Sequence, residues 1–109
     1  MSFHKAEGPI DKAEMSITLA LSPDETGKLA VVTWSISSNY PTSSPPGGHC
    51  GPEIRLFMVD KLINQMACDK RDGIWTTNET YLPGLRAVLE DWDCESQKFL
   101  KVCEVSLAP

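Results

Sequence analysis

Three side chains between residues 53 and 75 have the chemistry of a site for a small polar ligand. Arg55 offers a planar fork of donors, Gln65 an amide that accepts and donates, and Trp75 an apolar indole face. A sugar presents vicinal hydroxyls to the first two groups and a sheet of C–H groups to the third. Alone, each has an ordinary interpretation, as a solvated strand residue or a core anchor. Their conjunction predicts a sugar-binding site.

Three short strands must position these side chains. Two apolar runs in 53–68 are separated by Asp60-Lys61, and a charged turn at 69–73 leads into Ile74-Trp75. The alternation predicts a strand, a tight turn, a second strand, a wider turn and a third strand. Because Arg55 and Gln65 are nearly equidistant from the first turn, they are expected to face each other across the hairpin.

A helix is the rival interpretation of the same stretch. Leu56, Val59, Ile63 and Met66 recur at spacings of three and four residues, as on one face of an amphipathic helix. No capping residue precedes the run, however, and further apolar residues spread around such a helix. The hairpin is therefore favoured.

The four cysteines predict disulfides more readily than a metal site. None belongs to a C-x-x-C pair, and His4 and His49 add no ligand spacing typical of zinc. If 53–68 forms a hairpin, one disulfide connects its two strands near the open end. A second connects the two strands on either side of the turn at 95–98. The alternative is buried thiols in a cytosolic protein. The two expected pairs are Cys50 with Cys68 and Cys94 with Cys103.

Composition narrows the partners and the compartment. The net charge of −5, with scattered basic residues, argues against nucleic acid or an anionic membrane as partner. No apolar run approaches the ~18–20 residues that span a bilayer. The first residues lack the apolar region of a signal peptide. The expected compartment depends on the cysteines: the protein is secreted if they are disulfide-bonded and is otherwise cytoplasmic.

The remaining chain indicates one all-β domain over 15–109, preceded by an arm at 1–14. Residues 15–21 and 29–36 alternate or are β-branched, and 85–92 with 98–107 form a second hairpin. Four prolines and three glycines make 37–52 a long loop, which is either functional or a tolerated insertion. An antiparallel meander of about seven strands follows, as a two-blade propeller unit or a β-sandwich.

Catalysis is not expected. His49 and Cys50 are neighbours, so on an extended chain they point in opposite directions and form no nucleophile–base pair. The acidic run 90–95 offers carboxylates for calcium or acid–base chemistry, but a charged hairpin end explains it more simply. Residues 78–80 form a glycosylation sequon that matters only in a secreted chain. No cofactor or metal is indicated.

Short motifs resemble a blade of the fungal and bacterial fucose-binding lectins. In that family a blade reads approximately A-I-S-W, I-R-V-Y, I-x-E-Y-C-W-D and G-W-Y. The corresponding segments are 31–34, 54–57, 63–69 and 73–75, and 85–92 with 99–102 resemble the first two strands of a second blade. The resemblance covers about two-thirds of the chain.

The resemblance implies a non-catalytic lectin that binds a fucose-like monosaccharide. The family's sugar-binding arginine corresponds to Arg55, its tryptophan to Trp75 and its acceptor carboxylate to Gln65. An amide accepts less strongly than a carboxylate and also donates, so fucose specificity is in doubt. The second repeat has Leu100 or Lys101 in place of the arginine, and the loop 37–52 is unusual for the family. Two blades per chain would require an oligomer, most simply a trimer.

The alternative function belongs to another class. A small disulfide-stabilised β-sandwich would bind a protein, as an effector, inhibitor or immune-modulating protein does. The proline-rich loop supports this reading, because an exposed and partly rigid segment is suited to presenting contacts.

Overall fold

The computed structural model describes residues 15–22, 28–47 and 50–107, and the predicted arm 1–14 lies outside the described residues. This part of the chain is all-β, as predicted. Its seven strands are β1 (Met15–Leu21), β2 (Leu29–Ile36), β3 (Gly51–Met58), β4 (Lys61–Ala67), β5 (Asp72–Thr80), β6 (Leu85–Asp93) and β7 (Lys98–Ser106).

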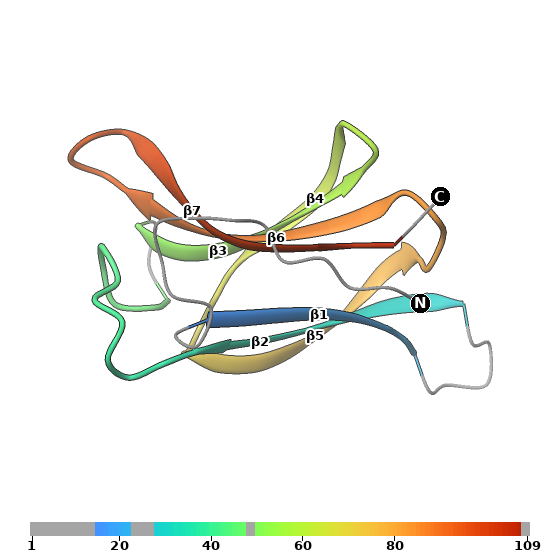
Figure 1. The fold of residues 1–109 in the computed structure, drawn as a ribbon, viewed down its shortest axis with the longest axis horizontal. Coiled ribbons are helices and arrows are strands. Elements are labelled where there is room, and N and C mark those ends of the chain that lie inside the picture. The colour runs from blue at the N-terminus through green and yellow to red at the C-terminus, as the bar shows by residue number, and fades with distance from the viewer. Residues whose placement is uncertain (1–14, 23–27, 48–49, 108–109) are drawn as a thin grey trace.

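The strands form a sandwich of two antiparallel sheets. Strands β1-β2-β5 form one sheet and β4-β3-β6-β7 the other, and Figure 1 shows the two as separate layers. The chain changes sheet after β2, after β4 and after β5. The strand order resembles the Greek-key arrangement of immunoglobulin-like sandwiches. In the constant type of that arrangement the fourth strand pairs with the fifth, whereas here it pairs with the third.

Of the two architectures expected, the topology is therefore that of the β-sandwich. A propeller blade would keep consecutive strands side by side in one sheet, whereas three of the six connections between the described strands here cross between sheets. The trimer was expected only in order to close a ring of blades, so this topology gives no reason for one.

Strand alternation builds the core. Inward side chains of both sheets are almost fully excluded from solvent, and each buried aliphatic side chain stabilises the fold by roughly 1.5–3 kcal/mol. The largest fully buried aliphatic side chains at inward positions are Ile17, Leu19, Val32, Ile54, Leu56, Leu85, Leu89 and Val105. Outward positions on the same strands are mostly polar or half-buried, and Val88 on β6 is an exception because it is buried.

The predicted hairpin and the predicted third strand are both confirmed, but the third strand does not continue the same meander. Strands β3 and β4 pair with Arg55 opposite Gln65, as expected, and Val59 enters the turn with a left-handed φ of 58°. Strand β5 does not pair with β4. It crosses to the other sheet, where Trp75 lies opposite Val32.

The crossing depends on a close contact between β2 and β5. Gly73 lies opposite Trp34, and a Cβ at Gly73 would come within 2.3 Å of Cζ2 of that indole. The Trp34 ring, which is only 2% exposed, therefore needs a glycine beside it. In addition, the backbone amide of Ile36 donates to the carbonyl of Arg71 at 2.8 Å. Together these contacts dock the start of β5 against the end of β2.

Candidate functional site

Three connections meet at one end of the sandwich. In these antiparallel sheets β2, β4 and β6 all finish at the end where β3, β5 and β7 begin. Figure 1 shows the β2–β3 and β6–β7 connections together at that end. We call the described residues of these connections the loop end: 37–47 with Cys50, 68–71, and 94–97. Loops on a rigid sandwich are where binding residues concentrate.

A buried carboxylate fixes the first connection. Asp91 occupies an inward position of β6 and is 0% exposed. It accepts hydrogen bonds from the Tyr40 hydroxyl at 3.1 Å, the Ser43 amide at 2.8 Å and the Ser43 hydroxyl at 2.7 Å. A carboxylate removed from water must be hydrogen-bonded to be tolerated, and these bonds supply that compensation. The middle of the loop is therefore tied to the sheet.

Arg71 ties the same loop to the second connection. Its Nη1 donates to the carbonyl oxygens of Ser37 and, at 3.1 Å, of Tyr40. Tyr40 itself is only 6% exposed and belongs to the core. Two side chains therefore hold the loop in place: Asp91, which belongs to β6, and Arg71, which belongs to the 68–71 turn.

A disulfide joins the first and third connections, and the predicted cysteine pairing was wrong. Cys50 is bonded to Cys94, with the Cα atoms 5.6 Å apart. Strand β3 pairs with β6 on one side and β4 on the other, and Cys50 lies just before the Gly51–Trp92 pair on the β6 side. The prediction considered only the β4 neighbour.

The other two cysteines remain thiols. Cys68 is 0% exposed and Cys103 is 3% exposed. Burial raises the pKa of the Cys68 thiol to about 12, with smaller contributions from the negative charges of Asp69 and Glu53. The alternative prediction of buried thiols therefore holds for these two. A protonated, enclosed thiol is a poor nucleophile and metal ligand.

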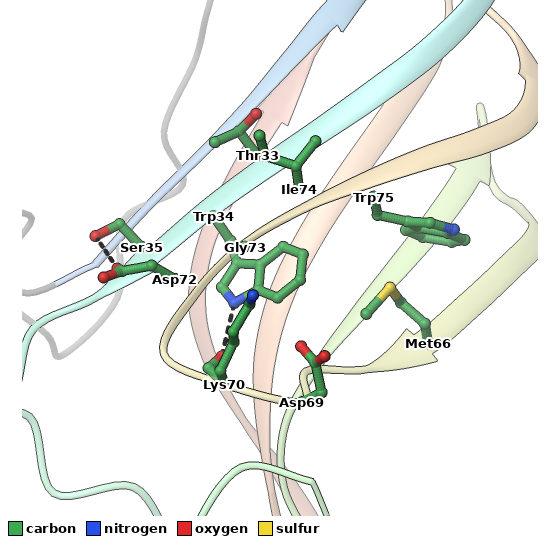
Figure 2. Close-up of a pocket in the computed structure, with 10 residues that line it drawn as sticks. All are labelled: Thr33, Trp34, Ser35, Met66, Asp69, Lys70, Asp72, Gly73, Ile74 and Trp75. Carbon is green, nitrogen blue, oxygen red and sulfur yellow. Dashed lines mark hydrogen bonds between the residues drawn. The ribbon is translucent and has the colours of Figure 1, made fainter.

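A cavity of about 810 Å³ lies beside the second connection (Figure 2). Trp34 and Trp75 contribute indoles to it, and Trp75 is drawn next to Met66 of the opposite sheet. The Trp34 Nε1 donates to the carbonyl of Lys70 at 3.0 Å, which fixes the turn against β2. The cavity therefore lies where the edge strands β4 and β5 diverge.

Charged groups border this cavity. Asp69, Lys70 and Asp72 line it and are exposed. Asp72 accepts a hydrogen bond from the Ser35 hydroxyl at 2.7 Å, so its carboxylate is held on the β2 side. Trp75 is half-buried, packs against the core and lines the cavity, so its indole is a core contact with one part facing the cavity. An indole face such as that of Trp75, beside carboxylates and an ammonium group, can take a polar ligand with an apolar face.

Arg55 and Gln65 do not line the cavity. They pair with each other on the outer face of the four-stranded sheet, whereas Trp75 points between the sheets. The Arg55 guanidinium lies 4.7 Å from the centre of the Phe99 ring, and its Nη1 is 3.8 Å from the Glu90 carboxylate. The structure thus unites two of the three predicted sugar-binding residues and separates the third.

The outer face around Arg55 forms a layer of its own. A second guanidinium, that of Arg86, lies 4.4 Å from the centre of the Phe57 ring, and the ring centres of Trp92 and Phe99 are 4.6 Å apart, with the planes tilted by 51°. Beneath this layer Val88, although at an outward position, is only 2% exposed. Burial raises the pKa of Glu53, and the nearby Arg55 charge partly opposes that shift. The face is therefore largely occupied by its own contacts.

Sequence reasoning missed the residues that organise the loop end. Asp91 was assigned to a charged hairpin end, although the inward alternation of Ala87 and Leu89 continues to it. Arg71 was read only as part of a charged turn. Across the described residues, no cluster of His, Cys, Asp or Glu could hold a metal ion. His4 and His49 lie outside them.

Comparison of the chain with protein-family models, with curated proteins and with solved structures finds no match. Within the described ranges there is also no helix with the length and apolarity that crossing a membrane requires.

Proposed function

We propose that this domain is a non-catalytic recognition module that binds another protein through the loop end. The observation that carries the proposal is the hold of Asp91 on Tyr40 and Ser43, which gives a surface loop a single arrangement. Binding with a loop that is already ordered avoids about 0.5–1.5 kcal/mol for each side chain that would otherwise be immobilised.

The composition of the loop suits protein contacts. Residues 37–47 contain serine, threonine, asparagine, tyrosine, proline and glycine and no charged residue. Ser38, Asn39, Pro41 and Pro45 are exposed along it. Serine, asparagine and glycine give adaptable hydrogen bonding in antibody loops, which occupy an end of a similar sandwich. The partner we infer is a protein surface with polar, largely uncharged groups.

A sugar is the second candidate ligand, and the cavity beside Trp75 favours it. Its volume of about 810 Å³ falls in the range of small-molecule sites, ~300–1,000 Å³. A fucose-like monosaccharide would stack on the Trp75 indole, with Asp69, Asp72 and Lys70 pairing with hydroxyls. In this version of the lectin proposal Arg55 and Gln65 have no part, because they lie on another face.

Two arrays probed with the same multimerised chain test the proposal. One array carries purified extracellular protein domains and the other carries glycans. Asn39→Arg places a large charge on the exposed loop, Trp75→Ala removes the indole from the cavity, and Thr18→Arg is the charge-matched control on β1, where Thr18 is exposed. Circular dichroism confirms that each variant is folded.

The protein-binding proposal predicts a protein hit that Asn39→Arg weakens at least tenfold and Thr18→Arg leaves unchanged. A glycan hit that Trp75→Ala abolishes and Asn39→Arg spares would establish the sugar candidate in its place. A protein hit that is equally sensitive to Thr18→Arg, or no hit on the protein array, contradicts binding through the loop end.

A further inference from the structure

We propose that Asn78 is an N-glycosylation site, which is independent of the function proposed above. Asn78-Glu79-Thr80 has the acceptor pattern, an asparagine followed two residues later by threonine with no proline between, and the sequence contains no other such triplet. Such triplets also occur by chance, so the argument depends on where the fold places this one.

The fold turns Asn78 outward on an edge strand. Among the described strands, β5 pairs with β2 alone, and the pairing is irregular between Leu29 and Val31, so 77–79 bulge opposite Ala30. Asn78 and Thr80 are exposed, whereas Thr77 is 1% exposed. A bulge at an edge leaves part of the backbone outside the ladder and aims a side chain away from the sheet.

Hydrogen bonds on the inner side keep this orientation. The Thr77 hydroxyl donates to the carbonyl of Ala30 at 2.8 Å and accepts from the backbone amide of Glu79 at 3.1 Å. The Glu79 carboxylate accepts from Nδ2 of Asn64, on β4 of the other sheet, at 3.1 Å. Because Thr77 and Glu79 are held by these hydrogen bonds, the Asn78 side chain between them faces solvent. A glycan attached to it displaces no contact of the core.

The disulfide supplies the second, independent observation. The Cys50–Cys94 bond belongs to an oxidising compartment, the same setting in which asparagine-linked glycans are added. The thiols of Cys68 and Cys103 are enclosed, so they are protected from mispairing in that compartment. The cysteine pattern and the acceptor triplet therefore point to the same route of synthesis.

The modification needs an oligosaccharide donor linked to a lipid through pyrophosphate. Nδ2 of Asn78 forms a bond to the anomeric carbon of the first sugar, and the bond from that carbon to the pyrophosphate oxygen breaks. Lipid pyrophosphate leaves with the bonding electrons, and the amide proton passes to a base of the transferase. No oxidant or reductant is consumed.

The glycan would cover one face and leave the loop end accessible. Asn78 is six positions along β5 from Asp72, a span of roughly 20 Å at ~3.3 Å per residue. Ile74, which is 70% exposed, points outward on the same strand and would be shielded in part by the sugar. An attached glycan would therefore cover the outer face of the three-stranded sheet away from the proposed binding surface.

Expression of the full chain behind a heterologous signal peptide in a eukaryotic secretion host tests this assignment. The chain from both medium and cells is run on gels before and after digestion with peptide-N-glycosidase F. The expected result is a slower band that digestion removes, absent from Asn78→Gln and Thr80→Ala and retained in Thr80→Ser, which keeps the acceptor pattern.

Thiol titration identifies the correctly oxidised chain, because Cys50 and Cys94 do not react with a thiol reagent when they are bonded to each other. If the disulfide-bonded chain shows no digestible band in medium or cells, the assignment is overturned. A digestible band that persists in Asn78→Gln overturns it as well, since the sugar would then be attached elsewhere.

Discussion

The carboxylate of Asp91 accepts both the backbone amide and the hydroxyl of Ser43, at 2.8 and 2.7 Å. One residue belongs to the interior of strand β6 and the other to a surface loop 48 positions earlier in the chain. The arrangement gives a loop rich in serine and proline the fixed geometry that the proposed function requires. It also predicts which substitutions loosen the loop.

Asp91→Asn should destabilise the domain by about 1–3 kcal/mol, because the new amide group places a donor against the donors of Tyr40 and Ser43. Urea unfolding measures the loss of stability. Hydrogen exchange of the variant, compared with wild type, should become faster in 40–47 by a larger factor than in the core strands. Asp93→Asn is the matched control, since Asp93 bonds only exposed groups in its own turn. Equal effects of the two substitutions would contradict the role given to Asp91.

Removing the disulfide should cost about 2–4 kcal/mol, because the bond closes a long segment of the unfolded chain. The Cys50→Ala/Cys94→Ala double variant and the reduced wild-type chain should lose the same stability in urea. The double variant should not respond to reductant. A wild-type chain whose unfolding is unchanged by reductant would mean that Cys50 and Cys94 are not bonded.

Gly73→Ala should destabilise the domain by about 1–3 kcal/mol, because the added Cβ collides with the Trp34 indole. Trp34→Phe makes room at the same place, so in that background the alanine should cost less. Thermal or urea unfolding of the two single variants and the double variant gives the coupling. Strict additivity would show that the two residues are not in conflict.

The Cys68 thiol predicts a loss of stability at high pH. Burial raises its pKa from 9.0 to about 12 in the folded chain, so the folded state keeps a proton that the unfolded state releases. This contribution is fully present below pH 9.0 and disappears as the pH rises to about 12. The difference in unfolding free energy between wild type and Cys68→Ala should shrink over that interval. A constant difference would contradict a buried, protonated thiol.

The sequence alone predicts local structure well in this chain. The all-β class, the 53–67 hairpin and the pairing of Arg55 with Gln65 all follow from alternation and turn position, and the structure confirms them. These features depend on residues that are close in sequence. Alternation reports which side chains share a face, and a short turn fixes the register of a hairpin.

Features that depend on the choice of sheet could not be read in this way. Alternation in 72–80 is the same whether β5 pairs with β4 or crosses to β2, so the position of Trp75 was misjudged. The partner of Cys50 was misjudged because β3 pairs with β6 as well as with β4. The sign that β5 crosses is Gly73, which makes room for the Trp34 indole, but this is visible only when both strands are placed. The burial of Asp91 likewise depends on a loop that comes from the other sheet.

The central claim is that the loop end, held by Asp91, Arg71 and the Cys50–Cys94 bond, is a protein-binding surface. Backbone chemical-shift mapping of the isotope-labelled chain, titrated with a protein found on the array, tests it most directly. The account predicts that the largest shifts fall in 37–47, 68–71 and 94–97. Largest shifts on the outer face of the four-stranded sheet, around Arg55 and Phe57, with the loop end unperturbed, would contradict it.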